Sequence, residues 1–404
     1  MRLVGPISVH GNAERPLPEG TSMAPRVHLR QLDLIRALTV VGVVAVHGTF
    51  FTNPEHSVGA GAAIMMLHYT REVFLFLTAF VLFYTYGERP IGLRRFWGKR
   101  FRVVLAPYVI WTLIYTYISM HPTWGEAPRF LRLVTLNLIE GKAWYHLYYL
   151  LITMQLYLLF PVAQWVIERT RGQHMFVWMA SAILELVLMA WDQYGVPQGG
   201  VLSFRNLAFF TYQFYLISGA IAATHRVPIE EWLVGHKATV TAAWVFSGVA
   251  ALGIYAFSYY GNGDSVTKAC TVFQPAMVPY CLTTIAMLYQ FGLKWARGNS
   301  PKVVRQALTS LSHHSFGIYL AHPLILYGIL KAVSGPVGSW WPLLRTVAVV
   351  ALTLTSTYAS VALVSLTPIS LVVLGRPRTR ISFRVRWPAR PLARRRVGNL
   401  GGSE

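Results

Sequence analysis

The sequence predicts an all-α polytopic membrane bundle with about ten membrane-spanning helices, and three observations predict it. Hydrophobic residues make up 54% of the 404 residues and charged residues only 13%, whereas about a quarter of the residues in a soluble domain are charged. Apolar stretches of about 20 residues, enough to cross a ~30 Å hydrocarbon layer as a helix, recur along the chain. Lys and Arg are concentrated on alternate connections between these stretches.

Ten such stretches follow one another from the amino terminus. Several are short or contain proline, so a count of nine is the alternative. The predicted spans cover residues 32–50, 63–86, 103–119, 144–165, 175–191, 206–223, 238–257, 273–292, 313–333 and 343–366.

The distribution of positive charge predicts the orientation of the chain. Cytoplasmic connections of membrane proteins collect Lys and Arg. With the amino terminus inside, the inner segments carry 27 of these residues and the outer segments carry 5. We therefore expect both termini in the cytoplasm and a multi-pass location in the plasma membrane.

The two ends of the chain differ in composition from the domain between them. Residues 1–31 are rich in proline and arginine and lack the apolar core of a signal peptide, which predicts a disordered cytoplasmic arm, with Met23 as an alternative start. Residues 32–366 form the predicted membrane domain. Residues 367–404 are a basic cytoplasmic tail that we expect to contact anionic membrane lipid. No groove-reading motif accompanies the net charge of +21, so no nucleic-acid partner is expected.

Two ionisable residues, Arg36 and His47, stand inside the first predicted helix. Such residues are costly in a membrane and usually mark a working site. Eleven residues turn a helix by three turns plus about 20°, so both side chains share one face, ~16 Å apart. Arg36 lies near the cytoplasmic boundary, where an anionic ligand arrives, and His47 lies deep, where a histidine can accept a proton from a hydroxyl.

A structural interpretation of these two residues is the alternative. Arg36 then extends to the lipid headgroups or pairs with Asp33, and His47 bonds a neighbouring helix.

The second predicted helix contains Arg71 and Glu72 near its start. A carboxylate beside a deep histidine can orient the ring and stabilise its protonated form. Glu72 is therefore the predicted orienting partner of His47, and Arg71 is a predicted cavity residue. An ion pair at the outer surface is the alternative.

Lys99, Arg100 and Arg102 form a basic cluster, predicted as a loop, before the third helix. Topology alone predicts such a cluster. Several cations beside a polar cavity also suit the phosphate groups of a ligand.

His146 and His322, together with Tyr319, are predicted to line the same cavity, because both histidines are placed in apolar helices. No HxxxH or CxxC spacing occurs, so no metal is expected. Cys270 and Cys281 are eleven residues apart in one apolar run, about 16 Å along a helix, which is too far for a disulfide.

Five segments together resemble the acyltransferase-3 family, the membrane O-acyltransferases that modify bacterial surface sugars, antibiotics and related molecules. Arg36 and His47 resemble its R-x10-H motif. The segment EVFLFLTAF resembles acidic-x-F-F-x-x-S-G-F, with Glu72 at the acidic place. KRFRVVLAPYVIW is similar to the basic R-x-x-R segment, HLYYL resembles H-L-W-F-L, and SFGIYLAHP resembles S-x-x-I-Y-L-x-H-x-P.

The resemblance implies a fold of about ten helices and an activity. An acyl group, expected to be acetyl, moves from cytoplasmic acyl-CoA to a hydroxyl of a sugar, glycan, lipid or secondary metabolite, with no permanently bound cofactor. His47 is implied as the essential base, with Arg36 as its partner. Lys99, Arg100 and Arg102 are then expected to bind the phosphates of the donor. An exporter or flippase of an acylated glycan or lipid, with the same charged cavity and no chemistry, is the alternative.

Overall fold

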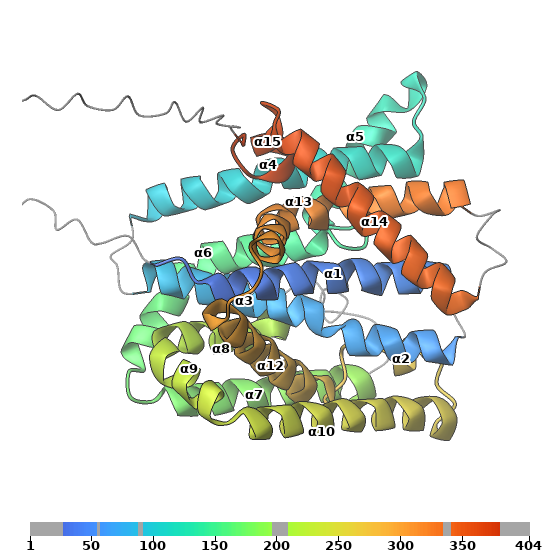
Figure 1. Cartoon of the computed structure of the whole chain (residues 1–404). Helices are drawn as coiled ribbons and strands as arrows, with labels where there is room; N and C mark the ends of the chain where they lie inside the picture. The colour runs from blue at the N-terminus through green and yellow to red at the C-terminus, as the bar shows by residue number, and fades with distance from the viewer. Residues whose placement is uncertain (1–26, 55–56, 88–91, 196–208, 334–340, 380–404) are drawn as a thin grey trace, which may run out of the picture.

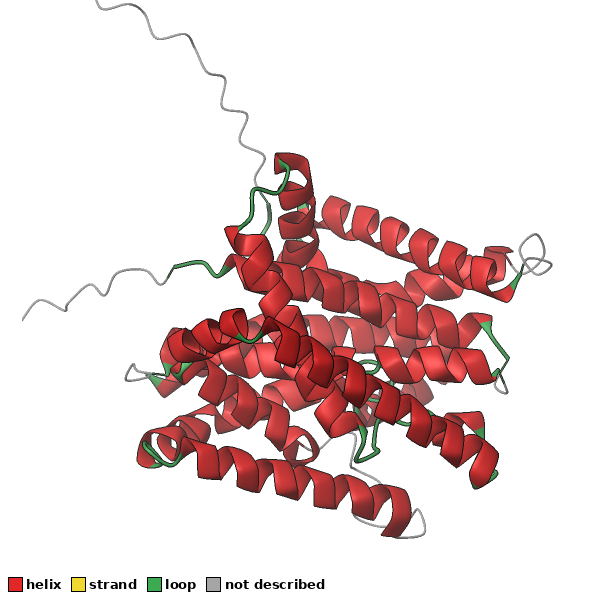
Figure 2. Ribbon diagram, turned by 60° about the horizontal axis from the view of Figure 1, so that its bottom comes forward, coloured by secondary structure: helices red, strands yellow, loops and turns green. Residues whose placement is uncertain are grey.

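The computed structural model describes residues 27–54, 57–87, 92–195, 209–333 and 341–379. Within these ranges every regular element is a helix, and no strand is present (Figure 2). The all-helical prediction is confirmed.

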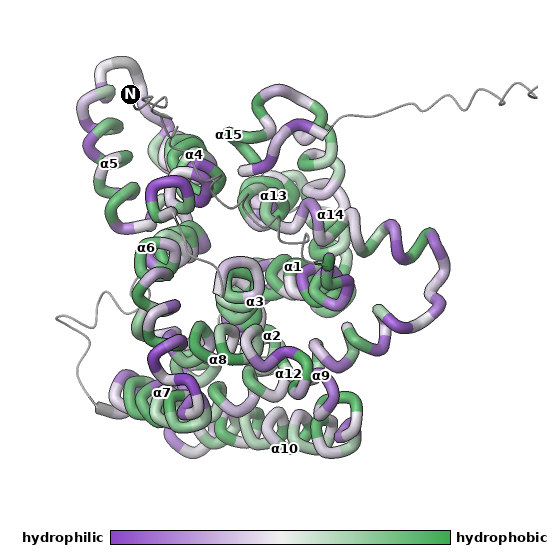
Figure 3. Tube along the Cα trace, turned by 90° about the vertical axis from the view of Figure 1, so that its left-hand side faces the viewer, coloured by the Kyte–Doolittle hydropathy of each residue, from purple (hydrophilic) through white to green (hydrophobic). Residues whose placement is uncertain are grey.

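Helix α1 (Arg30–Thr52) lies in the middle of the bundle beside α3 (Tyr69–Tyr86), as the nearly end-on view of Figure 3 shows. It packs against α12 (Met277–Arg297), α13 (Lys302–Val333) and α14 (Pro342–Ser365) (Figure 1). Small residues on α1 allow the close approach that membrane helices use: a Cβ added at Gly48 would lie 2.4 Å from a methyl group of Val350 on α14.

The other helices surround this centre. The group on one side of α1 contains α4 and α5, and the group on the other side contains α7, α8 and α10 (Figure 1). These helices are α2 (Val58–Leu67), α4 (Leu93–Met120), α5 (Ala127–Glu140), α6 (Tyr148–Arg169), α7 (His174–Ala190), α8 (Gln213–Thr224), α9 (Arg226–Gly235), α10 (Lys237–Ala256), α11 (Val266–Ala269) and α15 (Ser370–Leu374).

Eight helical stretches of the described chain are long and apolar enough to cross a membrane. They correspond to eight of the ten predicted spans: Arg30–Thr52, Val58–Tyr86, Leu93–Met120, Tyr148–Arg169, His174–Tyr194, Lys237–Gly261, Lys302–Val333 and Pro342–Ser365. The predicted span 206–223 overlaps α8, which has only 12 residues, and residues 196–208 lie outside the described residues. The predicted span 273–292 overlaps α12, which has 21 residues and is not among the eight.

Several helices begin elsewhere than predicted. Helix α4 begins at Leu93, so the basic cluster predicted as a loop is helical, and α13 begins at Lys302 rather than at 313. An apolar window detects only the lipid-buried part of a helix, whereas Lys, Arg and Gln continue it into the polar region. Helix α6 begins at Tyr148, so His146 lies in the turn before the helix and not in it.

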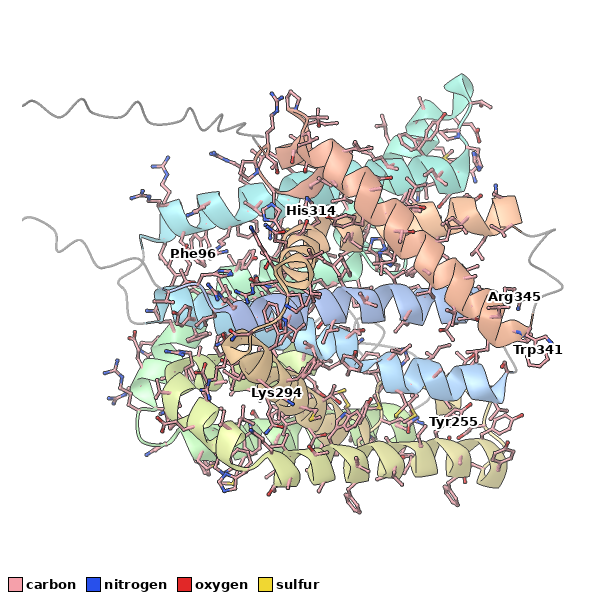
Figure 4. The ribbon with its side chains drawn as sticks, viewed as in Figure 1. Phe96, Tyr255, Lys294, His314, Trp341 and Arg345 are labelled. Carbon is pink, nitrogen blue, oxygen red and sulfur yellow. The ribbon has the colours of Figure 1, made fainter. Side chains whose placement is uncertain are left out.

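The ends of the helices gather at two opposite ends of the bundle. In Figure 4, Phe96 and Lys294 lie toward one end, and Tyr255, Trp341 and Arg345 lie toward the other. Two hydrogen bonds place α9 at the end where α1 begins and the last turn of α10 at the opposite end. Gln31 at the start of α1 donates to Glu230 of α9 (3.1 Å), and the Tyr255 hydroxyl near the end of α10 donates to the carbonyl of Val58 (2.8 Å).

Residues 367–379, predicted as the beginning of a tail, are folded against the bundle. Helix α15 packs on α4, and the indole N–H of Trp111 donates to the carbonyl of Val373 (2.9 Å). The backbone N–H of Thr379 donates to the carbonyl of Ser365 (2.8 Å). The remainder of the predicted tail and most of the predicted amino-terminal arm lie outside the described residues.

Candidate active site

Two cavities lie along one face of α1. The Arg36 cavity, of about 340 Å³, is lined by Arg36 and by residues of α3, α4, α6 and α13 together with Gly375 and Arg376. The His47 cavity, of about 140 Å³, is lined by His47 and by residues of α3, the turn before α6, and α13. Arg36 and His47, predicted on one face of α1, therefore line two different cavities.

Three aromatic side chains line both cavities. Phe74 on α3, Tyr149 on α6 and Tyr319 on α13 contribute to each lining, and the Phe74 and Tyr149 rings both face Tyr319, at ring-centroid distances of 6.4 and 5.5 Å. We call these three residues the aromatic partition. It brings the two cavities within one side-chain layer of each other.

The ring of His47 contacts two aromatic neighbours. Its centroid lies 4.4 Å from that of Tyr145 and 5.3 Å from that of His322. Its side chain lines the cavity, and no hydrogen bond to it is found within the described residues. The imidazole is therefore available to a ligand.

The tautomer of His322 follows from the residue after it. Pro323 has no backbone N–H, so the carbonyl of Tyr319, four residues earlier, lacks its helical donor. The Nδ1–H of His322 donates to this carbonyl (2.8 Å) and to that of Ile318 (3.1 Å). Nε2 is consequently the acceptor nitrogen, and it is buried without a partner in the described part of the chain.

His146 reaches the same place from the turn before α6. Its ring centroid lies 5.5 Å from that of His322 and 5.2 Å from that of Tyr319, and the Tyr319 hydroxyl donates to the His146 carbonyl. Both ring nitrogens are buried and bond none of the described residues. Although the histidines are close together, the described residues hold no group of His, Cys, Asp or Glu arranged for a metal ion.

Arg36 contributes an unpaired cation to its cavity. The neighbouring carboxylate, Asp33, accepts hydrogen bonds from Nε2 of His28 (2.6 Å) and from the hydroxyl of Ser312 (3.1 Å). Within the described residues, Arg36 itself has no hydrogen bond or ion pair. The Arg36–Asp33 pair of the structural alternative is thus not formed.

Arg71 and Glu72 bond each other. Successive helical residues point about 100° apart, so Arg71 faces the His47 cavity while the carboxylate of Glu72 is completely buried. Oε1 of Glu72 accepts from Nε (3.0 Å) and Nη2 (2.6 Å) of Arg71. The guanidinium also stacks on Tyr212, 4.5 Å from its ring centroid. Among the described residues no hydrogen bond joins Glu72 to His47, and Glu72 is not in the lining of the His47 cavity.

The comparison with protein families bears directly on these two cavities. The sequence model of the acyltransferase-3 family, described as an acyltransferase domain, matches residues 29–364. The chain belongs to the acyltransferase-3 family. The match contains α1 with Arg36 and His47, and all three residues of the aromatic partition. Comparison with curated proteins and with solved structures found no match.

Family membership makes the chain a multi-pass membrane acyltransferase, which is an enzyme that transfers groups other than aminoacyl groups. The predicted family and enzyme class are therefore confirmed. Transfer is also favoured over the exporter or flippase alternative.

The predicted phosphate-binding cluster of the acyltransferase lies beside the Arg36 cavity and not in its lining. Lys99 and Arg102 are exposed on α4. The Arg100 guanidinium stacks on Tyr86 and Tyr157, at 5.1 and 5.8 Å from the ring centroids. Of the described residues on α4, the two that follow the cluster, Val103 and Val104, line the cavity.

Several residues at the site of the acyltransferase are not among the predicted site residues. Arg376 falls in the segment interpreted as a tail, and Tyr145 and Tyr149 are not among the predicted cavity residues, although both line a cavity. His68, at the break between α2 and α3, lines the His47 cavity. The HLYYL match could have identified Tyr149, whereas no local signal identifies Arg376.

Proposed function

We propose that the acyltransferase moves an acyl group, expected to be acetyl, from cytoplasmic acyl-CoA to a hydroxyl of a sugar, glycan, lipid or secondary metabolite. The observation that carries this proposal is the pair of cavities on one face of α1, with an unpaired arginine in one and an unbonded histidine in the other. The aromatic partition is the thin layer across which the group passes.

In this proposal the donor occupies the Arg36 cavity. Arg36 is a guanidinium without a carboxylate partner among the described residues, and phosphate is a preferred ligand of such a group. The remaining lining is largely aromatic and aliphatic, which suits an extended thioester arm. The thioester carbonyl then lies at the partition.

The acceptor hydroxyl lies in the His47 cavity. The imidazole of His47 takes the hydroxyl proton while the oxygen attacks the thioester carbon. The tetrahedral intermediate then collapses: the carbon–sulfur bond breaks, the new ester remains on the acceptor, and the proton leaves with the coenzyme A thiol. His322 and His146 offer unpartnered ring nitrogens, which can position the acceptor. Glu72 acts indirectly, by fixing Arg71 at the cavity wall.

We further propose ten membrane crossings in the plasma membrane with both termini in the cytoplasm. The charge distribution supports this orientation. The Gln31–Glu230 bond supports two crossings, one by α7 and one by α8, since it places α9, which follows α8, at the end where α1 begins. The Tyr255–Val58 bond supports a further crossing by α10.

The central prediction concerns His47. Because general-base catalysis contributes about 10²- to 10⁴-fold, His47→Ala should lower kcat by about that factor. The measurement is release of free coenzyme A from labelled acetyl-CoA, and of labelled ester, by the purified protein with a panel of hydroxyl acceptors. His236→Ala is the matched control, since the exposed His236 directly follows α9, its ring contacts Trp232, and it is in the lining of neither cavity.

The outcome decides between transfer and transport. Turnover by His47→Ala at the wild-type rate would exclude His47 as the general base. Both variants are first checked for membrane insertion and for the unfolding midpoint of the wild type. Release of neither coenzyme A nor ester by the wild type with any donor thioester would instead favour an export role.

A further inference from the structure

The Arg36 cavity contains a second arginine that comes from the far end of the sequence. Arg376 follows α15 and lines the cavity together with Arg36. Its Nη1 donates to Nδ1 of His313 on α13 (2.8 Å). Two guanidinium groups therefore face one space whose lining, within the described residues, contains no Asp or Glu.

The backbone at Arg376 is fixed from several directions. Gly375 has a φ of +64°, a left-handed conformation that ends α15 and favours glycine. A Cβ at Gly375 would lie 2.3 Å from the carbonyl oxygen of Val103, so this turn is pressed against α4. The hydroxyl of Ser370 donates to the Arg376 carbonyl (2.9 Å). A solvated tail would need none of these contacts.

The electrostatics at this position are those of an anion site. Burial lowers the pKa of Arg376, and the charge of Arg36 lowers it further, while Asp33 acts in the opposite direction. Asp33 is already engaged by His28 and Ser312. Two like charges that share a half-buried cavity repel each other until an anion lies between them.

We propose that Arg36 and Arg376 together bind the phosphate groups of the acyl donor. We call them the arginine pair. This inference rests on the proposed function, which makes an acyl-CoA the donor. It transfers the phosphate-binding role from the basic cluster of α4 to a residue from the carboxy-terminal segment, which folds back over the cavity and completes it.

The test compares ligands with and without phosphates in the full-length protein in nanodiscs. Arg376→Gln should weaken the binding of coenzyme A about tenfold or more, as expected for a lost hydrogen bond between charged groups. S-acetylpantetheine has the pantetheine arm of acetyl-CoA but none of its phosphates. The KM of Arg376→Gln for this donor should equal that of the wild type. Arg376→Lys should restore part of the affinity for coenzyme A.

The control is Arg378→Gln, because Arg378 is exposed on the same segment two residues further and should leave the Kd of coenzyme A unchanged. Equal Kd values for wild type and Arg376→Gln would overturn the arginine pair. An equal loss for coenzyme A and S-acetylpantetheine would also overturn it, since it would indicate a merely structural role. Failure of acyl transfer with intact coenzyme A binding would instead refute the proposed function alone.

Discussion

At the scale of single residues, the Arg71–Glu72 pair shows how the protein keeps a charge inside a membrane bundle. The Glu72 carboxylate is completely buried and its Oε1 accepts two hydrogen bonds from Arg71. A charge in such a place persists because its partner is present. The pair also keeps the guanidinium against the His47 cavity.

Removal of Glu72 should therefore be costly. Glu72→Ala leaves Arg71 without its carboxylate, and breaking a buried pair in this way costs about 3–5 kcal/mol. We expect a clearly lower thermal unfolding midpoint in detergent, with part of the loss recovered in the double variant Arg71→Leu/Glu72→Ala. The control is Glu140→Ala, which removes an exposed ion pair with Lys142 that is worth about 0–1 kcal/mol.

The same variant distinguishes two roles for Glu72. A Glu72→Ala protein with wild-type stability and no activity would contradict the structural role and return Glu72 to the orienting role predicted from sequence.

Sequence alone gives a geometric relation between site residues only where one helix carries them. Arg36 and His47 lie on a single helix, so helical periodicity alone predicts their common face. His146 and His322 could be predicted as cavity residues, but their packing beside His47 and the place of Arg376 beside Arg36 depend on contacts between separate segments, which no local pattern specifies. The orienting role of Glu72 stays a prediction: its Oε1 bonds Arg71, and the sequence does not tell which side of α3 faces α1.

At the scale of helices, α3 and α8 approach each other closely, backbone against backbone. Gly219 of α8 lies against the backbone of α3, and a Cβ added there would be 2.4 Å from the carbonyl oxygen of Phe76. Unlike a flexible side chain, this backbone cannot move without displacing the helix. Helix α3 also carries Phe74 and Thr78, which line the Arg36 cavity.

Gly219→Ala should consequently separate the two helices. Overpacking of this kind costs about 1–3 kcal/mol, and we expect both a lower unfolding midpoint and weaker coenzyme A binding. Gly253→Ala is the matched control on α10, where an added Cβ meets nothing within 4 Å. If Gly219→Ala behaved like Gly253→Ala in both measurements, close packing at this contact would not be required.

The helix limits show what composition can predict. Eight predicted spans coincide with long apolar helices, since lipid burial leaves a strong signal in the sequence. The starts of α4 and α13 were missed by about three turns, because a helix continues beyond the membrane on residues that an apolar window ignores. Helix α8 carries a weaker signal still, since only 12 residues are helical.

At the scale of the whole molecule, the number of crossings decides on which side each connection lies. Ten crossings and eight crossings assign the connections at Lys237 and Lys268 to opposite sides, whereas Arg129 and Arg171 have the same assignment in both. All four side chains are exposed, and the native Cys270 and Cys281 are buried. Labelling of a cysteine introduced at one of these positions therefore has a low background.

We expect a membrane-impermeant maleimide added to intact cells to label Arg129→Cys and Lys268→Cys and to spare Arg171→Cys and Lys237→Cys. Permeabilised cells, in which all four should react, provide the control. Labelling at position 237 with protection at 268 would establish eight crossings, and the reverse pattern at all four positions would invert the orientation.

The aromatic partition has a consequence for the electrical insulation of the membrane. A passage open to both sides would let ions move down the membrane potential, at about 2.3 kcal/mol per charge for each 100 mV. Phe74, Tyr149 and Tyr319 line both cavities, and in the proposed reaction they form the barrier to hydrated ions. In the proposed reaction only the acyl group has to pass this point. The enzyme can therefore acylate an acceptor in one cavity from a donor in the other without opening a path for ions across the membrane.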